Sequence, residues 1–351
     1  MTACTRRHFL GLLAAGLAAP VWRSSGAVGA ERVLAVGPGA LRLLTYLGAA
    51  ERLVGLEDIE RRPLSTSSYR YALPPGLTDL PSIGPGGPGR LPDLEQLVAL
   101  RPDLVVTVTL DDQQIQALRE RAGLRVLPLS YGGPGLLRID DLLTSLHTLA
   151  AALGLEARAE QLAGFLTANL AELRERLANE SPATAYVGGV SLQGAHGLTS
   201  TQSGHPPLVW AGADNLADRA GPAGHLFIDR EQILLWDPPV LFIDGGGLAG
   251  ILAEYARESG FYQGLRAVRE GRVYLTLPFN AYNTNVENAL ANAWMMARVL
   301  HPAALADLDV QARASAILRT FLGADILPDL ARQGLGLGRL DLETGQWTPV
   351  S

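Results

Sequence analysis

The sequence predicts an α/β fold of two similar Rossmann-like lobes, each with a central parallel sheet, joined by one long connector helix. A segment of the front half, LEQLVALRPDLVV at 94–106, matches REQILLWDPPVLF at 230–242. Strand-like and helix-like segments alternate within each half, as they do in parallel sheets. Between the halves, apolar residues recur at three- and four-residue spacing over 155–177, which is typical of a long helix.

Two more segment pairs recur in the same order as the first. TYLGAAERL at 45–53 matches VWAGADNL at 209–216, and RVLPLSY at 125–131 matches RVYLTLP at 272–278. In the first pair, Glu95 aligns with Glu231 and Pro102 with Pro238. Two lobes of similar build imply a cleft between them, and clefts between domains are common ligand sites.

The first 30 residues resemble a targeting segment, and we expect them to be absent from the mature fold. Arg6 and Arg7 precede a short apolar run, and small residues before Glu31 suit cleavage after Ala30. The run is too short to span a membrane as a helix, which needs about 20 residues. The string TRRHFL resembles a twin-arginine export signal. An ordinary secretory signal or an N-terminal anchor is the alternative.

In the N-terminal lobe, expected at 31–153, seven segments alternate between strand and helix before a last helix. A Pro- and Gly-rich stretch at 61–89 has no apolar period and is expected to be a loop over the cleft. The expected strands are 32–36, 54–56, 104–108 and 125–129, and the expected helices are 40–47, 94–100, 113–122 and 140–153.

The connector helix is expected at 154–180 and the C-terminal lobe at 181–327. In that lobe we expect strands at 185–190, 240–243 and 273–277, and helices at 207–213, 232–235, 285–300 and 310–321. Residues 194–207 are expected to be a polar loop. The Gly-rich tail at 328–351 has no pattern that places it.

Composition and charge exclude several classes of protein. Cleavage would remove Cys4, the single cysteine, so no disulfide or thiolate metal site is expected. Removing three arginines with the signal takes the formal charge from −6 to −9, which argues against nucleic acid or an anionic membrane as partner. We expect a monomer without a resident cofactor or metal.

An exported enzyme is the main alternative of another class, and a scaffold or sensor built from the same lobes is a third. A hydrolase elbow needs G-x-S-x-G, but the string at 189–193 is GVSLQ. Dinucleotide binding needs a third glycine where Arg42 stands after Gly37 and Gly39. No H-E-x-x-H zinc motif occurs. We therefore expect no catalytic residues.

The repeated strings at 94–106 and 229–243 resemble those of periplasmic substrate-binding proteins that serve ABC importers of iron–siderophores, haem and cobalamin. The resemblance spans about 32–322 and implies two α/β lobes, one rigid connector helix and a shallow cleft. It implies capture of a solute, an iron complex such as a ferric siderophore, in the periplasm. Delivery to an inner-membrane permease with its ATPase would follow. The strings at 188–201 and 277–294 resemble an iron-transport subgroup. The same fold also serves molybdate and tungstate binders, which leaves an oxyanion as the alternative ligand.

In that family an acidic residue at the top of each lobe docks onto arginines of the permease, and Glu95 and Glu231 match those positions. Carboxylates suit arginine because the pair can form two parallel hydrogen bonds. Alternatively, each is an acidic residue that the helix dipole favours in a first turn.

Ligands of open α/β sheets bind beyond the carboxyl ends of the strands. Two expected ligand residues follow strands of the first lobe. Arg42 stands in the first turns of a helix and would bind an anion, and Tyr131 would donate a hydrogen bond or stack. A solvated arginine and a simply packed tyrosine are the alternatives.

Three further ligand residues are expected in the second lobe. His196 lies in a Gly-rich loop, and Tyr282 and Asn283 lie where the last strand enters a helix. Asn285 or Thr284 is expected to cap that helix. Tyr69, Arg70 and Tyr71 are candidates to close over the ligand. Neutral donors with one arginine suit a chelate or an oxyanion, whereas a bare metal ion prefers several His and carboxylate ligands.

Overall fold

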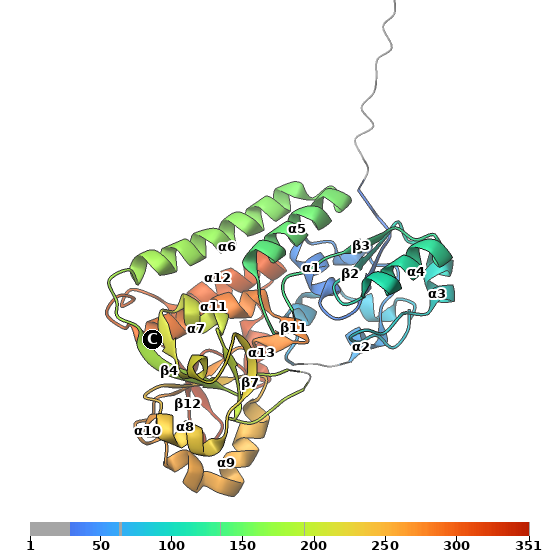
Figure 1. Cartoon of the computed structure of the whole chain (residues 1–351). Coiled ribbons are helices and arrows are strands. Elements are labelled where there is room, and N and C mark those ends of the chain that lie inside the picture. Colours follow the sequence, from blue (N-terminus) through green and yellow to red (C-terminus); the bar gives the residue numbers. More distant parts are fainter. Residues whose placement is uncertain (1–28, 63–64, 134, 193, 351) are drawn as a thin grey trace, which may run out of the picture.

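The computed structural model describes residues 29–62, 65–133, 135–192 and 194–350 and contains two α/β lobes (Figure 1). The predicted signal segment therefore lies almost wholly outside the described residues. The N-terminal lobe has a parallel sheet in the order β1-β2-β3. Its strands are β1 (Val33–Val36), β2 (Leu104–Thr107) and β3 (Val126–Pro128). Its helices are α1 (Ala40–Tyr46), α2 (Asp58–Arg61), α3 (Leu94–Leu100), α4 (Asp112–Ala122) and α5 (Ile139–Leu153).

Helices cover both faces of this first sheet, and alternate strand residues serve the two faces. Leu34, Val105 and Val126 share one apolar cluster with Leu97 of α3 and Leu118 of α4. The residues between them, such as Val33 and Val106, belong to the main core with α1 and α5. Burial on both faces explains why these strands are uniformly apolar in sequence.

The C-terminal lobe has a six-stranded sheet in the order β13-β12-β9-β8-β4-β6. Strands β4 (Ala183–Gly188), β6 (Ala213–Asn215), β8 (Leu241–Asp244) and β9 (Val273–Thr276) are parallel. The helices of this half are α7 (Pro206–Trp210), α8 (Arg230–Trp236), α9 (Leu248–Gln263), α10 (Arg266–Arg269), α11 (Val286–Leu300), α12 (Val310–Leu322) and α13 (Leu327–Arg332). Two short antiparallel pairs stand beside the sheet: β5 (Ser200–Ser203) with β7 (Gly224–Phe227), and β10 (Asn280–Ala281) with β11 (Asn283–Thr284).

The Gly-rich tail, which sequence reasoning left unplaced, extends this second sheet. Strands β12 (Gly338–Leu340) and β13 (Trp347–Pro349) pair antiparallel, and β12 also pairs with β9. The expected polar loop at 194–207 contains strand β5, and the expected strand at 54–56 is reduced to two isolated bridges at Leu53 and Leu56. The expected loop at 61–89 contains two short 3-10 helices, Ser68–Ala72 and Leu77–Asp79.

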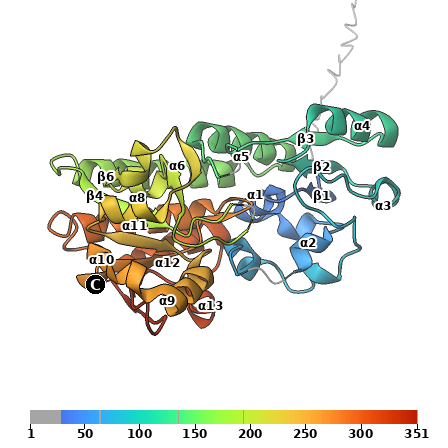
Figure 2. The same ribbon diagram turned by 60° about the horizontal axis from the view of Figure 1, so that its bottom comes forward.

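One long helix, α6 (Glu156–Arg176), runs along one side of the molecule from α5 to the start of the second lobe, as Figures 1 and 2 show. At about 1.5 Å per residue its 21 residues span about 32 Å. The predicted apolar stripe, including Ala159, Leu162 and Leu173, is buried. Among the described residues, no helix has the length and apolar character that a membrane crossing requires.

The internal repeat is a structural repeat as well. Helix α3 leads into β2 at the centre of the first sheet, and α8 leads into β8 between β4 and β9 of the second. The two helices end alike: Arg101 and Asp237 both have a left-handed backbone, with φ of 45° and 41°. Each stands before the proline of the repeat, Pro102 or Pro238.

Candidate functional site

The two lobes meet at loops that follow the carboxyl ends of their central strands. From the first lobe come the turn at 37–39 and the residues around Ser68, and from the second comes the stretch at 279–285 with the start of α11. Asn283 donates from Nδ2 to the carbonyl of Pro38 (2.8 Å), and Asn288 donates to the Ser68 hydroxyl (2.6 Å). These contacts define a seam between the lobes. Open α/β sheets bind ligands beyond the carboxyl ends of their strands, so the seam is the expected place for a ligand.

Arg42 lies at the centre of this seam and is completely buried. It donates to the Tyr131 hydroxyl (2.7 Å) and to Asn285 Oδ1 (2.8 Å), and its guanidinium carbon lies 5.0 Å from the centroid of the Tyr69 ring. Asn285 in turn donates to the carbonyl of Thr66 (2.8 Å). The arginine therefore links the lobes to each other in this structure, and a ligand would reach it only if the seam opened.

Three of the expected ligand residues come together here: Arg42, Tyr131 and Asn283. A side chain at Gly39, which has φ of 99°, would collide with the Tyr131 hydroxyl and the Asn283 amide. The glycine thus permits the close approach of the two lobes. Asn285 stands at the N-cap position of α11, but its side chain caps nothing because it bonds across the seam. The expected N-cap position is therefore confirmed at Asn285, but the Asn285 side chain forms no capping hydrogen bond.

A buried carboxyl accompanies the arginine. Glu287 is fully buried, and its Oε2 accepts a hydrogen bond from the Tyr46 hydroxyl. Burial raises the pKa of Glu287 above its ordinary value, although the Arg42 charge opposes that shift. Tyr46 also accepts from the backbone N–H of Val286 (3.2 Å), which ties α1 to the first turn of α11.

Beside this network lies a cavity of about 180 Å³ between the lobes. Its first-lobe contribution is Thr66, and the second lobe supplies Ser191, Gly194, Ala195, Gly246, Asn280, Ala281 and Tyr282. Every lining side chain is uncharged. Tyr282 has φ of 64°, which is rare for a bulky residue and marks a constrained position at the tip of the β10–β11 turn.

Several polar atoms near the cavity have no hydrogen-bond partner among the described residues. They are Ser191 Oγ and both amide atoms of Gln202, which is fully buried. A Cβ built on Gly135 of the first lobe would lie 3.4 Å from Asn280 Nδ2 and 3.8 Å from Gln202 Oε1, so the Gln202 amide also approaches the seam. Unpaired buried polar atoms cost free energy, and a bound ligand or water that satisfies them removes that cost.

Asp244 holds the second-lobe wall of the cavity in place. It ends β8, is fully buried, and accepts from the backbone N–H of Phe279 and of Gly246, both at 2.8 Å. Burial raises the pKa of Asp244 to about 7, against the effect of these two donors. Sequence reasoning missed Asp244, Ser191 and Gln202. Only Ser191 carried a signal, because it follows a strand in a Gly-rich string.

His196 does not line the cavity, although its neighbour Ala195 does. Its Nε2 lies 2.9 Å from the carbonyl oxygen of Leu192, and its ring packs edge-on against Phe227, 5.1 Å between centroids. His225 packs on the same phenyl ring at 4.8 Å. Burial, followed by the nearby His196, lowers the pKa of His225. Within the described part of the chain, no group of three or more His, Cys, Asp or Glu side chains is placed to bind a metal ion.

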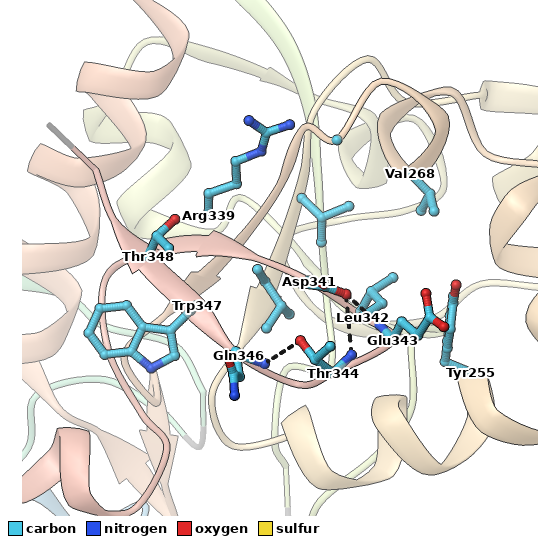
Figure 3. Close-up of a pocket in the computed structure, with 13 residues that line it drawn as sticks. Tyr255, Val268, Arg339, Asp341, Leu342, Glu343, Thr344, Gln346, Trp347 and Thr348 are labelled. Atoms are coloured by element: carbon cyan, nitrogen blue, oxygen red, sulfur yellow. Dashed lines mark hydrogen bonds between the residues drawn. The ribbon is translucent and has the colours of Figure 1, made fainter.

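Several larger hollows lie away from the cavity. One, of about 500 Å³, lies beneath the terminal hairpin of the second lobe and is lined only by residues 255–348 (Figure 3). There the Asp341 carboxylate accepts from the backbone N–H groups of Glu343 and Thr344 (2.8 and 3.2 Å) and so stabilises its own turn. Another, of about 600 Å³, lies along 60–78 and reaches Gln333 of the second lobe, and there Arg70 is already paired with Glu60 at 2.8 Å. We take the cavity of about 180 Å³ as the candidate site because Ser191, whose hydroxyl has no hydrogen-bond partner among the described residues, lines it beside the loops that follow strand ends of the second lobe.

The expected docking residues are far from the cavity in sequence and lie on repeated helices. Glu95 of α3 and Glu231 of α8 are both exposed, and neither forms an ion pair within the described residues. In Figure 1 the two helices belong to different lobes, α3 to the first and α8 to the second.

Comparison with solved structures supports the same fold. A TroA-like periplasmic binding protein, FepB from Veillonella parvula, matches with a TM-score of 0.64 and 20% identity, covering 85% of this chain and 93% of that one. The molybdate-bound protein MolA from Haemophilus influenzae matches with a TM-score of 0.66 and 18% identity, over 85% and 94%. A periplasmic haem-binding protein from Pseudomonas aeruginosa matches with a TM-score of 0.54 and 23% identity, over 78% and 94%. These likenesses establish the two-lobe fold and not the ligand.

No curated protein matches the sequence significantly. The family model described as periplasmic binding protein matches residues 33–278, which is well over half of the 351-residue chain. The match includes both copies of the repeat, the connector helix and the parallel strands β4, β8 and β9. The chain therefore belongs to the periplasmic binding protein family.

Proposed function

We propose that this protein is the periplasmic solute-binding component of an ABC importer that captures an iron complex, a ferric siderophore or similar chelate, in the seam between its lobes. The N-terminal segment, with Arg6 and Arg7, directs export, and the mature chain begins near Glu31. Membership of the family supports the binding role and the periplasmic location. The ligand class rests on the chemistry of the cavity.

The uncharged lining of the cavity carries the ligand assignment. A bare metal ion needs a cluster of His and carboxylate ligands, and an oxyanion needs a free cation or a set of convergent donors. The side chains that line the cavity are uncharged, and Arg42 is committed to Tyr131 and Asn285. Hydroxyl and amide groups such as Ser191 and Asn280 suit the oxygen and nitrogen atoms at the edge of an organic chelate.

The volume also bears on how such a ligand would bind. A cavity of about 180 Å³ is smaller than the usual ligand pocket of about 300–1,000 Å³. A chelate would therefore bind partly outside it, across Tyr282, which is 36% exposed at the cavity edge. His196, next to Ala195, lies close enough in the chain to contribute at this edge. Opening of the seam would add Arg42, Tyr131 and Asn283 to the contact surface.

The ligand assignment is tested by thermal shift on purified residues 31–351. The panel contains ferric siderophores of several chelate types, haem, cobalamin, molybdate and tungstate. A ligand that binds the folded state raises the melting temperature in proportion to RT ln(1 + [L]/Kd). We expect a shift with a ferric chelate. We also expect Ser191→Ala with Asn280→Ala to weaken its binding about fivefold or more, because each lost hydrogen bond is worth about 1 kcal/mol.

The matched control is Thr344→Ala in the hollow under the terminal hairpin, which should leave ligand affinity unchanged. A shift with molybdate or tungstate alone would replace the iron assignment with an oxyanion and keep the transport role. Equal affinities for the wild type and the Ser191/Asn280 double variant would move the ligand away from this cavity.

Delivery requires docking to a membrane permease, and we propose Glu95 and Glu231 as its charged contacts. Both carboxylates are exposed and unpaired among the described residues, and each stands in the first turn of a short helix. Their matched positions in the two lobes support a shared role, because the helix dipole alone would not require glutamate at both sites.

A further inference from the structure

The two copies of the repeat match in surface exposure as well as in sequence. Residues 91–100 and 227–236 have the same order of exposed, half-buried and buried positions, with a single difference at Gln96 and Gln232. In each copy the residue two positions before the glutamate is aspartate, Asp93 or Asp229. The core residues Leu97 and Ile233 also correspond, and both are fully buried. The two lobes therefore present copies of one surface.

In each copy of the repeat, large apolar side chains are exposed to solvent. Leu91 is 41% exposed and its counterpart Phe227 is 63% exposed. Val98 is 47% exposed and its counterpart Leu234 is 39% exposed. Single exposed apolar residues are common on protein surfaces. Two pairs at equivalent positions in both lobes are a pattern that scattered exposure does not explain.

The apolar residues stand beside the glutamates. Val98 follows Glu95 by three positions on α3, and Leu234 follows Glu231 by three on α8, so each pair shares a helix face. The second lobe additionally exposes Leu235 to 78%, where the first has Ala99. Each surface thus combines a carboxylate that is unpaired among the described residues with an aliphatic patch.

We propose that these two surfaces, each made of a glutamate and an adjacent aliphatic residue, bind the two equivalent subunits of a membrane permease through apolar contact as well as charge. This inference rests on the proposed function and adds Val98, Leu234 and Leu235 to the docking contacts. Two observations identify this partner. Duplicated surfaces are complementary to a partner that carries two copies of one receptor surface, and exposed carboxylates are complementary to arginines on that surface. Central apolar contacts supply affinity, whereas charges supply orientation and encounter rate.

The test measures docking of the full mature protein to the permease–ATPase pair encoded beside it, reconstituted in nanodiscs. The first variant is Val98→Ser with Leu234→Ser, and its matched control is Val209→Ser, an aliphatic residue of α7 that is 56% exposed and lies outside the two surfaces at 91–100 and 227–236. A second variant is Glu95→Ala with Glu231→Ala. All substituted positions are exposed, so we expect each variant to fold, and melting temperatures verify this.

We expect the Val98/Leu234 variant to bind the permease about tenfold or more weakly, from the loss of two buried aliphatic contacts, and Val209→Ser to bind like the wild type. At about 1 M salt the Debye length is about 3 Å, so docking of the wild type should weaken. At this salt concentration the wild type should still dock more tightly than the Val98/Leu234 variant. Ligand affinity should be the same for all four proteins.

Different failures have different meanings. If the Val98/Leu234 variant docks like the wild type while the Glu95/Glu231 variant does not, docking rests on charge alone. This inference is then overturned and the proposed function stands. If the wild type does not dock to the permease, or if the aliphatic variant instead abolishes self-association of the chain, both the inference and the docking role are overturned.

Discussion

The environment of Arg42 differs from the ligand-facing position that the sequence predicted for it. This arginine follows a Gly-Pro-Gly turn at the end of β1, where a cation is expected to face a ligand. In the structure it is fully buried, and its three hydrogen bonds join Tyr131 of its own lobe to Ala281 and Asn285 of the other. The Arg42 charge also acts on the buried carboxyl of Glu287, whose pKa it lowers against the larger effect of burial. The residue thus stabilises the closed seam.

Replacing Arg42 with leucine should therefore destabilise the protein by about 3 kcal/mol or more. The substitution removes a buried charged group and leaves Tyr131 and Asn285 without its hydrogen bonds. Urea unfolding gives the change in free energy. The control is Arg121→Leu, an exposed arginine of α4, for which about 0.5 kcal/mol or less is expected. A similar loss for both variants would contradict a linking role. Retained stability with lost ligand affinity would instead support the role that the sequence suggested for Arg42.

At the scale of the element, the repeated helices α3 and α8 end in a backbone conformation that costs free energy. Arg101 and Asp237 have left-handed φ values of 45° and 41°, and non-glycine residues pay about 1 kcal/mol there. Asp237 recovers part of this cost, since its Oδ1 accepts from the backbone N–H of Arg266 (2.6 Å). The Arg101 side chain forms no hydrogen bond within the described residues.

Arg101→Gly should therefore stabilise the protein by about 1 kcal/mol, whereas Asp237→Gly should change little because the gain in backbone freedom is offset by the lost bond to Arg266. Chemical denaturation of the two variants measures the difference. Gly123→Ala is the reverse control: it is a left-handed helix end with φ of 64° and no atom within 4 Å of an added Cβ, so only the conformational cost of about 1 kcal/mol should appear. Equal effects of the two glycine substitutions would show that Asp237 gains nothing from Arg266.

Comparison of the elements shows what local sequence can predict. Helix α3 was predicted with its observed bounds, 94–100, and α4 and α5 within one residue, because caps, prolines and apolar period lie within these segments. Strand β5 was missed because its residues, Ser-Thr-Gln-Ser, are polar and are buried only by the lobe around them. The tail strands were missed because their pairing with β9 is non-local.

The same limit applies to the site. The sequence predicted that Arg42, Tyr131 and Asn283 gather between the lobes, because each follows a strand end. It could not predict that Arg42 is sealed there, since its partner Asn285 lies 243 residues away in the chain. Nor could it predict the unpaired amide of Gln202, because a glutamine within a strand carries no signal of burial.

At the scale of the whole molecule, buried ionisable groups hold the strand ends and loops that meet at the seam between the lobes. Glu57 accepts from the backbone N–H of Gly37 (3.0 Å) at the end of β1, and Asp244 holds the corresponding end of β8. Glu287 lies in the first turn of α11 at the seam. Helix α12 adds a second connection, since its Phe321 packs on Tyr46 of the first lobe at 5.1 Å between centroids. Protonation of the carboxyls is therefore coupled to the integrity of the two-lobe core.

The carboxyls of Glu57 and Asp244 should consequently make stability fall as pH rises from about 4 to about 8. Burial raises the pKa of Glu57 to about 8 and that of Asp244 to about 7, while in the unfolded chain both ionise near pH 4. Between these values the folded state holds protons that the unfolded state has lost, so each rise in pH favours unfolding until the folded carboxyls ionise.

His205 has the opposite effect at lower pH, because burial lowers its pKa to about 3 and the unfolded chain takes up a proton below about 6.5. Urea unfolding at about pH 5.5, 6.5 and 8.5 should then show a free energy of unfolding that falls at each step, because the two carboxyls outweigh the single opposing proton of His205. Glu57→Gln should flatten that loss, and His205→Gln should change the profile only below about pH 6.5. A wild-type free energy of unfolding that rises towards pH 8.5 would mean that these carboxyls are already ionised in the folded protein.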